Sequence, residues 1–214
     1  MKKILVVFTG GTFSMMIDEK TGGAIPKYSG NELLGMIPEA KSLAEIECLD
    51  FGKYPGPHIT PELMLDLSKK INAKLKSDKF DGVVVTHGTD TLEETAYFLD
   101  LTIKTEIPIV VIGAMKNSSE PDWDGPKNLI DALHICLNEN SKNLGVLVCL
   151  NGEINAASEV TKIYSDSVES FKSLDFGTLG FVQKGRVIFN RLPRHLETIK
   201  TEKINTNVDL LTVY

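Results

Sequence analysis

Short runs of consecutive apolar residues recur along the chain and alternate with amphipathic segments. The first run, residues 4–8, contains no polar position. Such continuous runs are typical of strands that are buried on both faces, as in a parallel sheet. Similar runs occur at residues 82–85, 108–112 and 144–150, and residues 44–51 are a further, less uniformly apolar candidate. The pattern therefore predicts a core of buried strands.

Helical patterns lie between these strands. Thr60 followed by Pro61 is typical of a helix start, because the hydroxyl caps the first turn and proline fits the first helical position. Thr91 and Glu94 have the spacing of a capping box at the start of a second helix. A third helix is expected after Asp124, and a short one over residues 31–36, ended at Pro38. The apolar residues at helical spacing in the three longer segments are Leu63, Leu67, Ile71 and Leu75; Leu92, Ala96, Leu99 and Ile103; and Leu129, Ala132, Leu133 and Cys136.

The alternation of strands and helices predicts an α/β fold with a doubly wound, mostly parallel sheet and helices on both faces. Ligands in such folds bind at the carboxyl ends of the strands. Three turns fall there, at residues 9–12, 86–90 and 113–115. Residues 13–30 are rich in glycine and polar side chains, which predicts a mobile excursion, with a hairpin as one option. Residues 151–155 are expected to be a polar stretch without a helix.

Composition and charge exclude several classes of function. The chain has 214 residues, 42% of them hydrophobic and 24% charged, with a net charge of −6. This acidic balance argues against a nucleic-acid partner, which needs a basic surface. No apolar run approaches the roughly 20 residues of a membrane span, and the N-terminal run is too short for a signal peptide. We therefore expect a cytoplasmic protein with no membrane partner.

Cysteines and histidines give no sign of a metal site. The three cysteines have no CxxC spacing and are odd in number, which indicates reduced, buried thiols. The four histidines are scattered without ligand spacing. The residues are Cys48, Cys136 and Cys149, and His58, His87, His134 and His195.

Two turns that carry hydroxyl groups are candidates for chemistry. Gly10 and Gly11, between Thr9 and Thr12, permit close approach of a ligand to the backbone, although an ordinary glycine-rich turn has the same pattern. Neither GxxxxGK[ST] nor GxGxxG is present, so phosphate binding is disfavoured.

The second turn holds Thr89 and Asp90 at a helix start. Taken alone, these residues are better explained by helix capping, but Gly88 and the first-turn amides would favour an anion. A threonine nucleophile needs a proton acceptor nearby. A cluster with Lys162, otherwise an ordinary surface charge, would supply one.

Taken together, these segments resemble the bacterial L-asparaginase/glutaminase family in order and spacing over essentially the whole chain. The two threonine signatures together are highly specific. The matching segments are Thr9–Thr12; Thr86–Thr91 with Glu93–Ala96; Gly113–Met115; Asp124–Pro126 with Asn128 and Leu129; and Val160–Lys162.

The resemblance implies hydrolysis of L-asparagine to L-aspartate and ammonia, with Thr12 as the nucleophile and a threonine acyl-enzyme. Thr89, Asp90 and Lys162 match the family's second catalytic cluster. It also implies a lid after Thr12, no metal or organic cofactor, and a homodimer or homotetramer as the assembly. The expected partner is a small amide amino acid. The substrate-binding positions it implies are Gly11, Gly56, Pro57, Gly88, Ala114 and Tyr28.

The chain departs from the family pattern at three places. Family members have a tyrosine in the lid that hydrogen-bonds to the nucleophile. Ala24 occupies its position in this chain, and Tyr28 is a nearby residue that would substitute for it. A serine and a polar residue that bind the substrate α-carboxylate are replaced by Gly56 and Pro57. The resemblance also implies domain boundaries: residues 1–195 as the nucleophile-bearing domain, 196–207 as a linker, and 208–214 as the first strand of a smaller C-terminal domain that is absent. That domain normally supplies an acidic residue to a neighbouring site, so this chain alone is expected to be weakly active or inactive.

Two alternatives remain open at this point. One is an asparaginase-like subunit of a tRNA-dependent amidotransferase, which would have an extra N-terminal region and a partner subunit. The other is a non-catalytic amino-acid-binding domain that retains the fold, motivated by Gly56 and Ala24.

Overall fold

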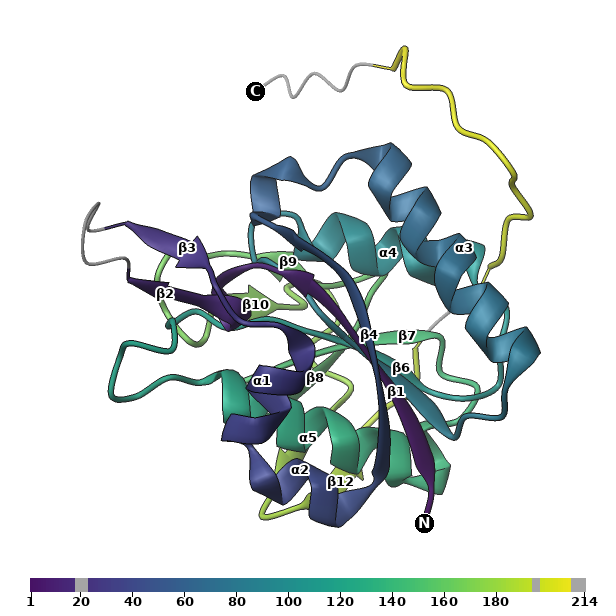
Figure 1. The fold of residues 1–214 in the computed structure, drawn as a ribbon. Coiled ribbons are helices and arrows are strands. Elements are labelled where there is room, and N and C mark those ends of the chain that lie inside the picture. The colour runs from purple at the N-terminus through teal and green to yellow at the C-terminus, as the bar shows by residue number, and fades with distance from the viewer. Residues whose placement is uncertain (18–22, 194–196, 209–214) are drawn as a thin grey trace.

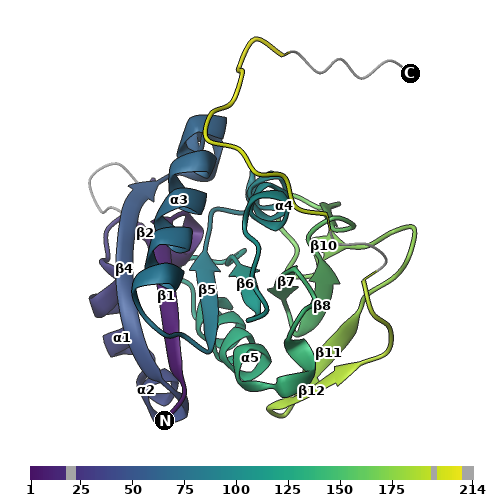
Figure 2. The same cartoon turned by 90° about the vertical axis from the view of Figure 1, so that its right-hand side faces the viewer.

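The computed structural model describes residues 1–17, 23–193 and 197–208. Its centre is an eight-stranded sheet in the order β12-β11-β8-β7-β6-β5-β1-β4. Figures 1 and 2 show this sheet between helices on both faces. The strands are β1 (Lys3–Gly10), β4 (Glu45–Tyr54), β5 (Gly82–Thr86), β6 (Ile109–Ile112), β7 (Val146–Leu150), β8 (Glu153–Ala156), β11 (Gly180–Gln183) and β12 (Arg186–Phe189).

The helices and two small sheets complete the fold. A hairpin pairs β2 (Met15–Ile17) with β3 (Ala24–Pro26), and β9 (Thr161–Lys162) pairs with β10 (Phe171–Lys172), both antiparallel. The α-helices are α1 (Gly30–Met36), α2 (Pro38–Leu43), α3 (Pro61–Ser77), α4 (Leu92–Thr102) and α5 (Gly125–Leu137). Short 3₁₀ turns are η1 (Thr12–Ser14), η2 (Gly56–His58) and η3 (Glu139–Ser141).

Five adjacent strands, from β4 to β7, are parallel, and this confirms the predicted fold class. The remaining strands β8, β11 and β12 run antiparallel at one edge. Residues 151–155 contain no helix, as predicted, but most of them belong to a strand that the sequence did not predict. Asn151 and Gly152 have φ of 50° and 79° and form a tight turn, which returns the chain as β8. Residues 153–156 therefore form a strand because they pair with β7, and not because their own sequence favours one.

Alternate residues of the central strands supply two separate cores. Ile4, Val6 and Phe8 of β1 face α1, α2 and α5, whereas Leu5 and Val7 face α3 and α4. All five side chains are at most 2% exposed. Burial on both faces explains why the strand contains no polar position, and it holds the carboxyl end of β1 in a fixed place.

Helix starts match the sequence in some places only. Thr60 caps α3 by accepting a hydrogen bond from the Leu63 amide, as predicted. The predicted capping box at Thr91 was wrong, because its hydroxyl donates instead to the Gly56 carbonyl at 2.7 Å. Pro38 follows the short helix, but it also occupies the first turn of α2, which the sequence did not predict.

The structure describes only part of the segment after Thr12, which is expected to be a lid, and only part of the C-terminal segment. The predicted hairpin is present as β2 and β3, and Ser118 and Ser119 hydrogen-bond to its first strand; residues 18–22 lie outside the described residues. Residues 197–208 contain no helix or strand. They run beside α4 (Figure 2). The Ile199 amide donates to the carbonyl of Leu101 in that helix. Of the predicted strand 208–214, residues 209–214 lie outside the described part. None of the described helices has the length and apolar character needed to cross a membrane.

Candidate active site

Three glycines bring together the turns that follow β1, β4 and β5. A Cβ on Gly88 would lie 2.6 Å from the Gly56 Cα and 2.7 Å from its nitrogen. A Cβ on Gly11 would collide with the Gly88 backbone. Because no side chain fits between them, the three backbones touch directly. Gly11 and Gly88 immediately precede Thr12 and Thr89, so this contact places the two candidate threonines at neighbouring positions.

The turn carrying Thr12 is built by the end of β1. Gly10 has a φ of +109°, and the Gly11 amide donates to the Tyr54 carbonyl at 2.9 Å. Phe13 is fully buried, with its ring 6.3 Å from that of Phe8 and 5.8 Å from that of Trp123. Thr12 between them is half-buried, and within the described residues its hydroxyl makes no hydrogen bond. The turn therefore presents a hydroxyl that has no partner among the described residues.

Lys162 joins the second candidate cluster. Its Nζ donates to Thr89 Oγ1 at 2.9 Å and pairs with Asp90 Oδ1 at 2.9 Å. The lysine side chain is 17% exposed, and that of Asp90 is 55% exposed. Lys162 is 73 positions from Thr89 and 72 from Asp90, so sequence proximity does not create these contacts. The structure thus assembles the predicted Thr–Asp–Lys group.

The loop after β6 forms a third wall. A Cβ on Gly113 would lie 2.8 Å from the Thr89 methyl group, and Ala114 is fully buried beside it. Asn128 of α5 donates to the Gly113 carbonyl at 3.0 Å. Asp124 accepts from the amides of residues 115 and 116 at 3.0–3.1 Å. Residues of the Asp124–Asn128 motif therefore hold this loop against Thr89.

His87 lies beneath the second turn and is fully buried. Its Nδ1 donates to the Gly88 carbonyl at 2.8 Å, and Nε2 has no hydrogen-bond partner in the described part of the chain. Burial lowers the pKa of His87 to about 4, because the imidazolium would be poorly solvated there. The C=O and N–H of a trans peptide point in opposite directions, so holding the Gly88 carbonyl also orients the Thr89 N–H.

Acid should destabilise the fold through His87. Its pKa is depressed on folding, so the unfolded chain binds more protons between the ordinary pKa near 6.5 and about pH 4. The contribution is complete above pH 6.5 and is lost as the pH falls, by up to about 1.4 kcal/mol per pH unit. Urea unfolding of wild type and His87→Asn at pH 7, 6 and 5 measures it.

The asparagine amide keeps a donor for the Gly88 carbonyl but does not titrate. We expect a shallower loss of stability in acid for His87→Asn, and no change for His58→Asn at an exposed position. Equal pH slopes in wild type and His87→Asn would contradict the assignment.

Two predicted binding residues are less well placed. The Tyr28 hydroxyl lies 3.5 Å from Met16 Sδ and makes no hydrogen bond to Thr12, and its ring packs against the core. Pro57 is exposed. Gly56 is buried in the glycine contact and offers backbone groups only. The structure thus brings Gly11, Gly56, Gly88 and Ala114 to the two threonine turns, but gives the Tyr28 hydroxyl another neighbour.

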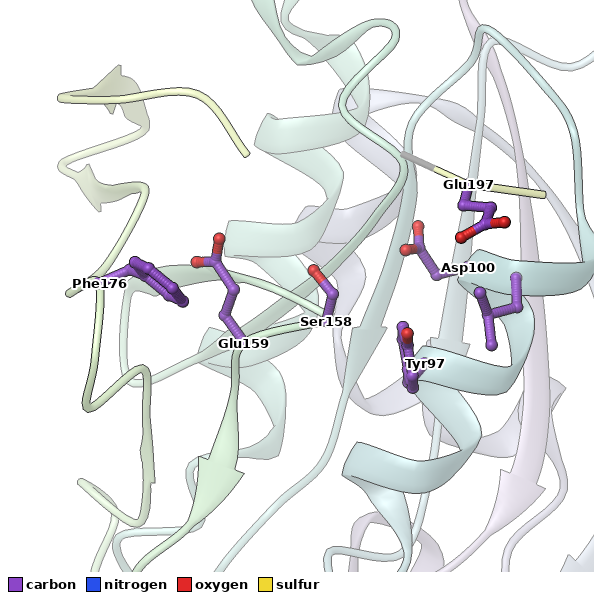
Figure 3. Close-up of a pocket in the computed structure, with 7 residues that line it drawn as sticks. Tyr97, Asp100, Ser158, Glu159, Phe176 and Glu197 are labelled. Carbon is purple, nitrogen blue, oxygen red and sulfur yellow. The ribbon is translucent and has the colours of Figure 1, made fainter. Parts of the chain in front are cut away.

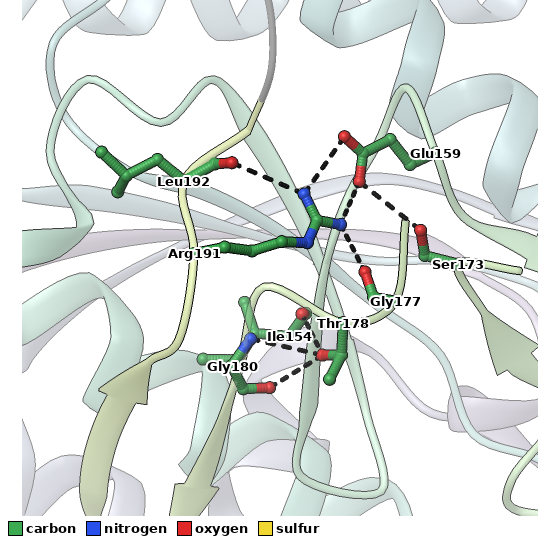
Figure 4. A network of polar contacts seen from close by, with 8 residues as sticks. All are labelled: Ile154, Glu159, Ser173, Gly177, Thr178, Gly180, Arg191 and Leu192. Carbon is green, nitrogen blue, oxygen red and sulfur yellow. Dashed lines mark hydrogen bonds and ion pairs between the residues drawn. The ribbon is translucent and has the colours of Figure 1, made fainter. Parts of the chain in front are cut away.

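The segment that leads to Lys162 is held by a partly buried ion pair (Figure 4). Glu159, with a side chain 5% exposed, pairs with Arg191. The guanidinium also donates to the Gly177 carbonyl and so holds the loop that contains Gly177.

Near this ion pair lies a cavity of about 190 Å³ (Figure 3). Its lining residues are Tyr97, Asp100, Leu101, Ser158, Glu159, Phe176 and Glu197. It contains none of the candidate catalytic residues, so we place the site at the threonine turns, where the polar groups converge.

The predicted site residues include no histidine and no cysteine. In the described ranges, no three His, Cys, Asp or Glu side chains are grouped to hold a metal ion. Cys48, Cys136 and Cys149 are free thiols. Burial raises the pKa of the Cys48 thiol to about 11 and also raises those of the other two.

Comparison with known proteins agrees with the geometry. The family model "Asparaginase, N-terminal" matches residues 3–195. The chain is 40% identical over 200 residues to a probable periplasmic L-asparaginase of Haemophilus influenzae, covering 92% of this chain and 57% of that protein. It is 37% identical over 200 residues to L-asparaginase 2 of Escherichia coli, with the same coverage of both chains.

Solved structures show the same likeness. The crystal structure of a probable cytoplasmic L-asparaginase from Campylobacter jejuni superposes with a TM-score of 0.83 at 39% identity, covering 91% of this chain and 58% of that one. The chain thus spans a little over half the length of the relatives it matches. The sequence match, the sheet topology and the paired threonine turns agree, and the chain belongs to the asparaginase family.

Proposed function

We propose that this protein hydrolyses the side-chain amide of L-asparagine to give L-aspartate and ammonia. The observation that carries the proposal is the contact between the Thr12 turn and the Thr89 turn, with Lys162 bonded to both Thr89 and Asp90. A two-step acyl transfer requires a nucleophile and a nearby group that takes and returns a proton. Thr12 would be the nucleophile, and the lysine-bearing cluster would be that group.

In the first step, Thr12 Oγ bonds to the amide carbon and the C–N bond breaks. The amide nitrogen leaves as ammonia, with the hydroxyl proton as its third hydrogen. In the second step, water attacks the resulting ester, and one of its protons returns to Thr12. We assign proton transfer to the Thr89–Lys162–Asp90 cluster. The backbone amides of the two turns would stabilise the oxyanion in both steps.

The names of the relatives support asparagine as the substrate. Both curated relatives compared above are called L-asparaginases. Members of the family to which this chain is similar are named from both the cytoplasm and the periplasm, so a cytoplasmic location stays a prediction. We also propose a homodimer or homotetramer as the assembly and no cofactor for the reaction.

Ammonia release from L-asparagine and from L-glutamine tests the proposal directly. We expect release from asparagine, which is predicted above to be weak or absent for this chain alone, and a stable adduct at Thr12 when the protein is incubated with an electrophilic asparagine analogue. Intact mass and peptide mapping locate that adduct. A protein that releases no ammonia and whose mass is unchanged by the analogue would not be an amidohydrolase.

Gly56→Ser should strengthen asparagine binding. Family members carry a serine that binds the substrate α-carboxylate at this position, and a lost hydrogen bond to a charged group costs about 1.5–3 kcal/mol. A Cβ on Gly56 would lie 3.3 Å from three atoms of Asp90, its backbone nitrogen included, so the expectation requires Asp90 to shift by a few tenths of an ångström. We expect KM to fall by about tenfold or more, with kcat little changed. Gly35→Ser, at an exposed glycine with open space around it, is the control. An unchanged or higher KM would show that Gly56 does not face the carboxylate.

The same glycine favours a second candidate function, an amino-acid-binding domain without turnover. It predicts that asparagine raises the melting temperature while ammonia release and the Thr12 adduct are both absent.

A further inference from the structure

Lys162 lies on a strand that the main sheet does not hold. Its strand β9 contains two residues and, in the part of the chain that the structure describes, pairs with β10 alone, which is equally short. The Ile163 amide adds one further bond, to the Ser170 carbonyl at 2.7 Å. So small a sheet is marginal by itself. The position of the lysine must therefore be secured by something outside β9 and β10.

Glu93 provides that connection. Thr161 Oγ1 donates to one oxygen of its carboxylate at 3.0 Å, and the backbone amide of Lys162 donates to the other oxygen. Both donors belong to β9, and Glu93 lies in the first turn of α4. A carboxylate that accepts two hydrogen bonds at once fixes the orientation of the group it binds as well as its distance.

The anchor and the target of Lys162 belong to one continuous segment. Thr89 and Asp90 directly precede α4, and Glu93 is three residues after Asp90. Glu93 holds the backbone end of the lysine, while Thr89 and Asp90 hold its ammonium end. Residues 89–93 therefore contact both ends of Lys162. The distance between its backbone and its ammonium group is matched to the distance between Glu93 and Thr89 within this one turn.

We propose that Glu93 is the positioning residue that places Lys162 against Thr89. It acts through the backbone of β9 and touches no reacting atom, and the proposal rests on the function proposed above. The competing explanation is that Glu93 only stabilises α4, as a negative charge near the N-terminus of a helix does. Glu94 separates the two, because it is also acidic and in the first turn but forms no hydrogen bond to β9.

The test combines a chemical probe of Lys162 with kinetics on the full chain. Brief acetylation by acetic anhydride, read by peptide mass spectrometry, measures how freely the Lys162 amine reacts. Lys172, paired with Glu153 at 2.5 Å, is the internal reference. We expect acetylation of Lys162 to rise several-fold in Glu93→Ala and to stay at the wild-type level in Glu94→Gln. Asparagine turnover should fall by about 10²-fold in kcat, the cost of a displacement of about 1 Å, with a smaller change in KM.

Glu93→Gln preserves shape and one acceptor, so we expect a loss of kcat of only about tenfold. It replaces the alanine variant if that variant fails to fold. Unchanged Lys162 acetylation in the folded Glu93 variants would overturn the proposal. Raised acetylation with a wild-type kcat would also overturn it, as would a loss of kcat in Glu94→Gln equal to that in the Glu93 variants. Raised acetylation in a series where even the wild type releases no ammonia would support the placement by Glu93 and reject the proposed function instead.

Discussion

Thr12→Ala is expected to lower ammonia release from L-asparagine by about 10⁴-fold or more, because loss of a nucleophile removes the acyl-enzyme route entirely. The change should leave the fold intact. The Thr12 hydroxyl makes no hydrogen bond within the described residues, and Phe13 and the Gly11 amide hold the turn without it. Steady-state ammonia assays together with thermal melts check both parts.

Two further variants of the same turn separate chemistry from structure. Thr12→Ser keeps the hydroxyl and should retain activity to within about 10²-fold, the cost of a slightly misplaced group. Thr9 is fully buried and donates to the Thr86 carbonyl at 2.9 Å. Thr9→Val should therefore cost about 1–3 kcal/mol of stability and leave the nucleophile in place. Equal activity of Thr12→Ala and wild type would assign the attack to another residue.

Lys162→Met is expected to lower kcat by about 10²–10⁴-fold, the usual contribution of a positioned acid or base. KM should change less, because the glycine turns that we propose to bind substrate remain in contact. The ion pair with Asp90 is more than half exposed on the carboxylate side, so we expect little loss of stability from breaking it. Kinetics with L-asparagine and a melting curve measure the two effects.

The matched control is Lys172→Met on the partner strand β10. It removes the same charge from the same small sheet but lacks any contact with Thr89 or Asp90. Lys162→Arg adds a second comparison, because a guanidinium stays charged and cannot accept a proton. Full activity in Lys162→Arg would show that the residue serves as a fixed charge rather than in proton transfer.

Much of the central fold could be predicted because its signals are local. Residues 4–8 are apolar throughout since both faces of β1 are covered, and Thr60 with Pro61 starts α3 through its own first-turn amides. Where a partner elsewhere in the chain decides the outcome, the same reasoning failed. Thr91 satisfies the capping pattern, but the Gly56 carbonyl is close enough to take its hydroxyl. β8 is polar for a strand and forms because β7 lies beside it.

The candidate site divides in the same way. The glycine–threonine turns follow predicted strands, so their common edge could be inferred from topology, and the family resemblance supplied the roles. Lys162 had no local signal, and neither did Glu93 as its anchor, because their contacts join residues about 70 positions apart. His87 also looked ordinary in the sequence, since only burial lowers its pKa.

By itself, the sequence determined the parallel core, the edge of the sheet where chemistry is possible, and the residue types available there. These follow from periodicity and from turn residues, which act over a few positions. Only the tertiary structure decided that Gly11, Gly56 and Gly88 touch, that Lys162 reaches Thr89, and that Tyr28 turns to Met16. Those contacts depend on how separate strands and loops pack, which no local pattern encodes.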